Sequence, residues 1–224
     1  MLVSEIVKRV RSAIDERMVN DSQFLSDSED EKNLTQIIKD SIGYALQHVI
    51  ENAPLDRLDG SMFETLTPTQ IGQSFSIDAE FVGRLTLPDG LLRIVDARLS
   101  SWSLFPIPEP NTSQAYLMQQ DKYARGSWDR PVNILNGRTL EMYCAKPDTE
   151  DPTTTTDTLI FVFIRKPDVV IDAQHQDPNV TVPARLEASL IYQIAGLAML
   201  AFKEEIAASF FALAQKYDAD GLNS

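Results

Sequence analysis

Apolar residues near the C-terminal end of the chain recur every three or four positions between Pro183 and Tyr217. This spacing predicts an α-helix with one apolar face. As one piece the helix would be ~50 Å long at about 1.5 Å per residue, and a change of phase at Phe202 leaves room for a kink near Lys203–Glu205. A helix of this length needs other apolar faces against which to pack.

Two further helices are predicted near the N-terminus. The first covers about Ser4–Val19, where apolar residues recur every fourth position at Ile6, Val10, Ile14 and Met18. The second covers about Asn33–Asn52, has a wide apolar face and is ended by Ala53-Pro54. Helices from both ends of the chain bury their apolar faces if they meet in space, which predicts a small helical bundle closed by the termini.

Between Leu55 and Val182 the pattern changes to the alternation that is typical of β-strands. Residues 77–87 and 91–102 flank a Pro-Asp-Gly turn at 88–90 and predict one β-hairpin. Asn136-Gly137 lies between two further strand-like runs and predicts a second hairpin with a two-residue type I′ turn.

Leu159–Ile164 is apolar on both faces and predicts a central strand, whereas residues 113–125 are expected to form a short helix or an ordered loop. The fold class expected from these elements is α+β. Two N-terminal helices and a long C-terminal helix, in residues 1–54 and 183–224, would form the helical core, and residues 55–182 would form an inserted antiparallel sheet of at least five strands.

The composition narrows the possible functions. The formal net charge of −13 argues against a protein that holds nucleic acid through its phosphates, because that needs clustered Lys and Arg. The single cysteine, Cys144, excludes an intrachain disulfide and fits a reducing compartment. No signal peptide is expected, and the apolar run Leu190–Phe202 is shorter than the ~20 residues of a membrane-spanning helix.

No catalytic pattern is present in the sequence. Phosphate-binding, dinucleotide-binding and nucleophile-elbow motifs are missing, and the two histidines, His48 and His175, have no partner at metal-ligand spacing. The acidic stretch Asn20–Glu31 lacks the glycine and the closing glutamate of a calcium-binding loop. We therefore expect neither an enzyme nor a protein with a cofactor or metal ion.

Aromatic residues in the middle of the chain are candidates for an interface, where aromatic side chains often supply most of the binding energy. They lie in or beside proline-rich stretches, and packing of these stretches onto the sheet explains them equally well: Trp102, Phe105, Tyr116, Tyr123 and Trp128. The basic residues of the first helix pose a similar question, because they suit either an acidic partner or an ordinary solvated face.

Three helical segments resemble the head–tail connector (adaptor or ring) proteins of tailed bacteriophages: LVSEIVKRVRSAIDE, LTQIIKDSIGYALQHVIENAP and LEASLIYQIAGLAMLAFKEEIAASFFALAQKY. In the insert, YLMQQDKYARGSWDRPV and NGRTLEMYCAK are most similar to ring proteins of crAss-like phages. The resemblance covers the helical ends, roughly half of the chain, and extends only loosely to the insert.

This resemblance implies a structural protein of the virion neck that is made in the host cytoplasm. It implies a homo-oligomeric ring, typically twelvefold, that contacts the portal protein and further ring or tail proteins. It implies no catalysis, no cofactor, no metal and no membrane. Genomic DNA would pass through the ring without specific binding, and an acidic channel wall suits that passage because like charges repel.

Subunit contacts in a ring join two different faces of the protein. One candidate pair is the basic face of the first helix and the acidic loop of a neighbouring subunit, through Arg9, Arg11, Arg17, Asp27, Glu29 and Asp30. Reversing Arg9 and Arg11 to Glu is expected to weaken assembly and to leave the monomer folded. By analogy with the family, Phe210, Phe211 and Tyr217 are expected to dock on the portal, and a place in the subunit's own core explains them equally well. The alternative is a monomeric α+β binding module whose aromatic insert grips a peptide or glycan.

Overall fold

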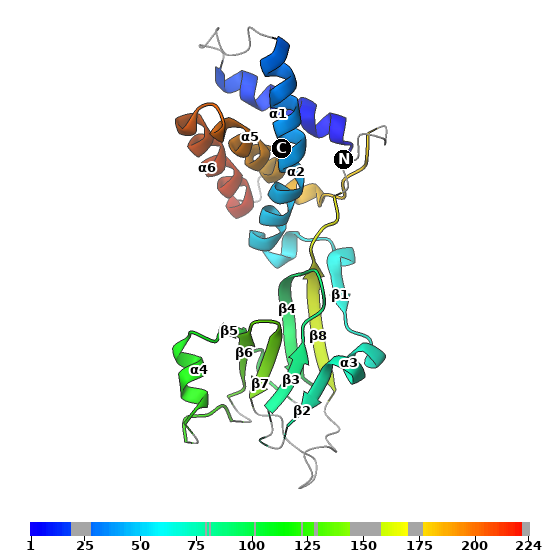
Figure 1. Ribbon diagram of the computed structural model, residues 1–224, viewed down its shortest axis with the longest axis vertical. Helices are drawn as coiled ribbons and strands as arrows, with labels where there is room; N and C mark the ends of the chain where they lie inside the picture. The colour runs from blue at the N-terminus through cyan, green and yellow to red at the C-terminus, as the bar shows by residue number, and fades with distance from the viewer. Residues whose placement is uncertain are drawn as a thin grey trace. The chain divides into compact units, whose positions relative to one another are not determined.

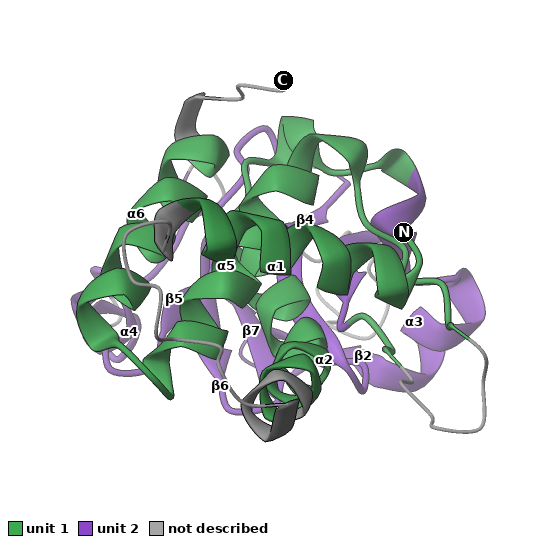
Figure 2. Ribbon diagram, turned by 90° about the horizontal axis from the view of Figure 1, so that it is seen from above, with its two compact units in different colours: residues 1–60, 167–224 green, residues 61–166 purple. Residues whose placement is uncertain are grey.

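The computed structural model describes residues 1–18, 28–78, 80, 82–100, 102–121, 123–127, 130–143, 158–169 and 177–220. The protein is α+β, which confirms the expected fold class. The chain divides into two compact units (Figure 2). Residues 1–60 and 167–224 form the helical unit, and residues 61–166 form the sheet unit.

The helical unit is built from both ends of the chain. Its helices are α1 (Val3–Met18), α2 (Ser28–Asn52), α5 (Glu187–Leu200) and α6 (Glu204–Asp220), with the short 3-10 helices η1 (Leu55–Arg57) and η3 (Ala184–Leu186) (Figure 1). Helix α5 contacts α1, α2 and α6, so it lies at the centre of the unit. It is apolar on most of its circumference, and this composition is typical of a buried helix.

The prediction of one long C-terminal helix was wrong, because the chain reverses direction between α5 and α6. The turn covers residues 201–203, and the amide of Lys203 donates to the carbonyl oxygen of Met199 (2.7 Å). Tyr192 of α5 stacks on Tyr217 of α6, and the ring of Phe211 lies against Gly196, which places the two helices antiparallel. The change of phase at Phe202 thus marks two helices whose apolar faces pack on each other.

The boundaries of the insert also differ from the expected ones. Residues 55–60 belong to the helical unit because Arg57 Nη1 donates to the carbonyl oxygens of Tyr217 (2.9 Å) and Asp218 at the end of α6. Residues 177–182 belong to it because the amide of Val3 donates to the carbonyl oxygen of Pro178 (3.1 Å) beside a β-bridge between Leu2 and Asn179. Hydrogen bonds to backbone carbonyl oxygens, such as these, cannot be predicted from the pattern of apolar and polar residues.

The sheet unit contains two sheets rather than the single sheet expected (Figure 1). The first has the order β1-β8-β4: β1 (Phe63–Thr65), β8 (Leu159–Arg165) and β4 (Leu91–Leu99). The second has the order β2-β3-β7-β6-β5: β2 (Phe75–Ile77), β3 (Val82–Thr86), β7 (Thr139–Tyr143), β6 (Val132–Asn136) and β5 (Glu109–Pro110). Its β5–β6 pair is parallel, whereas the other strand pairs of both sheets are antiparallel.

The two sheets share one apolar core. Leu85 and Leu140 of the second sheet and Phe161 and Phe163 of the first are almost fully buried in it. Three short helices complete the chain: η2 (Gly60–Met62), α3 (Pro68–Ser74) and α4 (Gln114–Gln119). Residues of α4 pack against a second, smaller cluster around Val82, Ile134 and Tyr143.

One predicted hairpin is confirmed and the other was wrong. Strands β3 and β4 lie in different sheets, because β3 pairs with β2 and β7 whereas β4 pairs with β8. Strands β6 and β7 do form a hairpin, but Asn136 pairs with Thr139, so its two-residue turn is Gly137-Arg138. Gly137 has a φ of 59°, and a glycine at the first central position is typical of a type II′ turn rather than the expected type I′.

Candidate interaction surfaces

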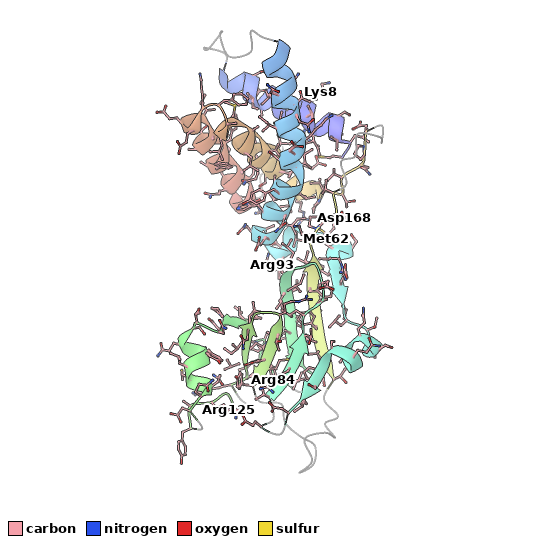
Figure 3. The ribbon with its side chains drawn as sticks, viewed as in Figure 1. Lys8, Met62, Arg84, Arg93, Arg125 and Asp168 are labelled. Atoms are coloured by element: carbon pink, nitrogen blue, oxygen red, sulfur yellow. The ribbon has the colours of Figure 1, made fainter. Side chains whose placement is uncertain are left out.

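The arginines of α1 have partners inside the helical unit. Arg9 Nη1 donates to Glu187 Oε2 of α5 (2.9 Å), and Arg11 Nη2 donates to Thr35 Oγ1 of α2 (2.8 Å). Reversing them to Glu would remove both of these contacts as well as change the surface charge, and the expectation that the monomer stays folded remains a prediction. Lys8 is exposed on the same helix (Figure 3) and is the better surface probe.

The other half of the proposed charge pairing lies outside the described residues. This applies to the whole of Asp27 and to the side chains of Arg17, Glu29 and Asp30. The pairing between the basic helix face and the acidic loop stays a prediction.

A groove with a volume of about 300 Å³ lies between α1, α5 and the end of α6. Its lining combines small, aromatic and charged side chains: Arg9, Ser12, Ala13, Glu16, Ala188, Ile191, Tyr192 and Tyr217. The ring of Tyr192 stacks on those of Phe210 (6.3 Å between centroids) and Tyr217 (5.2 Å). The groove therefore has an aromatic wall that is fixed by packing within the α5–α6 hairpin.

The three residues expected to dock on the portal hold this hairpin together. Phe210 is completely buried, Phe211 lies against Gly196, and Tyr217 is half-buried against Tyr192. Phe210 is thus a core residue in this conformation, which favours the core alternative over a portal anchor for this residue. Tyr217 still reaches a surface, because it lines the groove.

A polar cluster lies where α6 ends. Arg57 donates to the last carbonyl oxygens of α6, and the carboxyl group of Asp218 is half-buried beside it. Burial raises the pKa of Asp218 above its usual value, and the neighbouring Ser189 hydroxyl and the charge of Arg57 offset this only in part. The cation at the helix C-terminus is favourable for the helix dipole, whereas the buried carboxylate is a cost to the fold.

The chain matches no protein-family model and no curated protein sequence. The interpretation of its surfaces therefore depends on their geometry and on the resemblance described above.

The candidate aromatic residues of the sheet unit separate into buried and exposed ones. Trp102 is 3% exposed and belongs to the core between the sheets, so packing explains it. Tyr116 is half-buried against the outer cluster of the second sheet. Phe105 and Tyr123 are 62% and 96% exposed, whereas Trp128 lies outside the described residues.

The exposed aromatic residues lie in a stretch of the chain, residues 104–123, that is rich in exposed apolar side chains. Of ten large apolar side chains that are exposed in the described part of the chain, six lie between residues 104 and 123: Leu104, Phe105, Ile107, Leu117, Met118 and Tyr123. Exposed apolar side chains gathered in this way mark interaction sites. A signal was present in the alternation of prolines with large apolar residues at 104–110.

A cluster beside α4 is held by hydrogen bonds and charge. The hydroxyl of Tyr143 donates to Glu141 Oε2 (2.8 Å), and the guanidinium of Arg125 lies 5.2 Å from the Tyr143 ring centroid (Figure 3). Burial raises the pKa of Tyr143 far above its usual value, and the neighbouring carboxylate raises it further. Tyr143 therefore stays protonated and serves as a hydrogen-bond donor.

The described residues contain no cluster of three or more His, Cys, Asp or Glu side chains that could hold a metal ion. Among the helices of that same part of the chain, none combines the length and apolar character needed to cross a membrane. Cys144, the single cysteine, lies outside the described residues.

Proposed function

We propose that this protein is a structural component of the neck of a tailed bacteriophage, where copies of it form a ring. The ring would join the portal to further ring or tail proteins and line the channel through which DNA leaves the head. The chain would have no catalytic role in this process.

One observation carries the proposal. The three segments that resemble connector proteins begin at Leu2, Leu34 and Leu186, and all of them lie in the helical unit. They are distant in sequence, yet their helices α1, α2 and α5 contact one another. The resemblance therefore applies to one folded unit rather than to unrelated helices, and the sheet unit is an insertion within it.

The charge of the chain supports the same function. A net charge of −13 repels the phosphate backbone of DNA, so the genome would pass the ring without being held. Interaction surfaces without catalytic groups also suit a protein that connects other proteins. The groove of the helical unit and the exposed apolar surface at 104–123 are two such surfaces.

Capture by the portal protein tests the proposal. The portal encoded in the same phage genome would be purified as an assembled ring, mixed with the full chain and analysed by size-exclusion chromatography with light scattering. We expect the chain to elute with the portal at a fixed ratio, and a mixture with major capsid protein to show no such complex. Elution of the chain as a separate species at every concentration tried would contradict the proposal.

A second candidate function follows from the exposed apolar surface of the sheet unit. Tyr123 and its apolar neighbours suit a binding module that grips a peptide or glycan, since aromatic faces stack on such ligands. This function predicts that a glycan or peptide array binds the wild-type chain and not a Tyr123→Ala variant. A connector protein predicts no selective signal on the array.

A further inference from the structure

The segment Ser103–Pro110 presents three large apolar side chains to solvent within four residues. Leu104, Phe105 and Ile107 are 50%, 62% and 81% exposed, and the guanidinium of Arg98 covers one face of the Phe105 ring, 4.1 Å from its centroid. Removing such side chains from water is favourable by about 25 cal/mol per Å² of apolar surface, so a partner that covers them gains binding energy.

The backbone of this segment is restrained before any partner arrives. Prolines at 106, 108 and 110 each fix one backbone dihedral angle, and the residues before them are confined to extended conformations. The buried amide of Asn133 donates to the carbonyl oxygen of Pro106 (3.2 Å) and to that of Ala97 in β4 (2.7 Å). A restrained segment loses little conformational entropy on binding.

The segment has the character of a proline-rich ligand. Proline-rich extended peptides bind in grooves that are lined by aromatic side chains. The groove between α1, α5 and α6 has this composition, because Tyr192 and Tyr217 form its wall and Ala13, Ala188 and Ile191 add apolar surface. Its volume of about 300 Å³ lies at the lower end of the range of ≈ 300–1,000 Å³ that is usual for pockets with compact ligands.

Charge fixes the orientation of such a ligand. Glu109 follows the three apolar residues and is exposed on the edge strand β5. Arg9 lines the groove with a side chain that is 40% exposed, and Glu16 also lines the groove, so a glutamate is favoured only beside Arg9. A glutamate beside the apolar segment can therefore pair with the arginine at the groove, where it would share the guanidinium with Glu187.

We propose that the segment Ser103–Pro110 of one copy binds in the α1/α5/α6 groove of a second copy, with Phe105 and Ile107 against Tyr192 and Tyr217. The two surfaces differ, so the contact is heterologous and each copy can bind one neighbour on either side. Repetition of such a contact gives a ring if the rotation closes. The inference rests on the proposed function, which requires a repeated contact of this type, and it names the two surfaces that make it.

Two variants with complementary defects test this contact. Phe105→Ser/Ile107→Ser removes the ligand segment and keeps the groove, whereas Ser12→Trp fills the groove from an exposed position and keeps the segment. Sedimentation velocity on the full-length chain should show concentration-dependent oligomers for the wild type and monomers for each variant alone. An equimolar mixture of the two should give one-to-one dimers and nothing larger, because one intact contact remains.

Matched controls keep the test specific. Tyr44→Ser/Leu200→Ser removes two other exposed apolar side chains, 62% and 49% exposed, and should associate like the wild type. Circular dichroism verifies that each variant is folded. If Ser12→Trp does not fold, Ala188→Trp serves as a second variant that fills the groove. Three results would each overturn the contact: a wild type that stays monomeric up to about 1 mM, association unchanged in the segment variant, or a mixture without dimers.

The outcome is separate from that of the portal experiment. Capture of a monomeric wild-type chain by the portal would reject this contact and keep the proposed function. Oligomers that obey the complementation pattern and ignore the portal would keep the contact and reject the function.

Discussion

At the scale of single residues, Gly196 sets how closely α6 approaches α5. A Cβ atom added at this position would lie 2.5 Å from Cε1 of Phe211, which is closer than carbon atoms can pack. Because Gly196 has no side chain, the Phe211 ring can occupy this space. The apolar spacing from Pro183 to Tyr217 predicts helical structure here, but it cannot identify α6 as the partner of α5.

Gly196→Ala tests this contact. Although alanine favours the helix by up to about 1 kcal/mol, overpacking against the Phe211 ring costs about 1–3 kcal/mol, so we expect a net loss of stability in urea unfolding. Gly43→Ala in α2 is the matched control, because its Cβ would meet Val169 at an ordinary 3.8 Å. The control should be neutral or stabilising, and equal behaviour of the two variants would show that Phe211 moves aside freely.

Two acids of the helical unit have pKa values that are shifted in opposite directions. Burial raises the pKa of Asp218, whereas hydrogen bonds from the amide and hydroxyl of Ser4 at the start of α1 lower the pKa of Asp177. A raised pKa favours the folded state at low pH, and this contribution is lost as pH rises through the folded pKa. A lowered pKa favours the folded state at higher pH, and this contribution is lost as pH falls.

The two Asp→Asn variants should therefore show opposite pH dependence. Relative to the wild type, Asp218→Asn should gain stability as pH rises from about 3 to 7, because it removes the buried charge. Asp177→Asn should lose stability over the same range, because it removes a carboxylate that caps α1. Thermal unfolding across this pH range measures both, and parallel curves for the two variants would refute these assignments.

At the scale of elements, the sequence revealed which segments are helices and strands better than it revealed their partners. The alternation of apolar and polar residues in β3 and β4 predicts which side chains of each strand face the core. These two strands, on either side of the turn at Gly90, pack into the same core but belong to different sheets. The pattern is the same for a hairpin and for a crossing between sheets. Likewise, the stripe from Pro183 to Tyr217 fits one long helix or a helical hairpin, and only the tertiary packing distinguishes them.

The side chain of Asn133 links β6 to two other segments of the sheet unit, and no sequence motif predicts this link. Its amide is fully buried and joins β6 to the carbonyl oxygens of Ala97 and Pro106. Asn133→Ala should destabilise the sheet unit by about 1–3 kcal/mol in urea unfolding, since buried carbonyl groups lose their donor. Asn111→Ala removes an exposed hydrogen bond to Asn136 (3.0 Å) and should change stability by less than about 0.5 kcal/mol. Equal effects would contradict the role of Asn133.

At the scale of the whole molecule, the sheet unit has an apolar core of its own. The main core of the sheet unit contains residues from Leu66 to Phe163, all within residues 61–166. The helical unit is assembled from both sides of this insertion. The sequence placed the boundaries at 54 and 182, because polar contacts such as the hydrogen bonds of the Arg57 side chain and the β-bridge of Asn179 leave no apolar pattern.

The fragment 61–166 should consequently fold alone. Its ¹H–¹⁵N spectrum should be dispersed and should superpose on that of the full chain away from the cut ends, because its core needs no residue from the helical unit. A fragment with a collapsed spectrum would show that the sheet unit depends on the helices.

The candidate surfaces were predicted less completely than the fold. Phe105 and Tyr123 are exposed as an interface requires, but Trp102 and Phe210 fill cores, because apolar periodicity does not distinguish a side chain that faces the core from one that faces a partner. The groove brings Arg9 and Tyr217 together from opposite ends of the sequence. Only the three-dimensional arrangement creates such a site.

Electron cryo-microscopy of the virion neck tests the central proposal most directly. We expect a phage genome to encode this chain, and we expect its virions to contain a symmetric ring beneath the portal that fits repeated copies of the helical unit, with one sheet unit per copy. Mass spectrometry of the same particles should detect the chain. A complete neck whose density is fully explained by other proteins, in particles that lack this chain, would contradict the account.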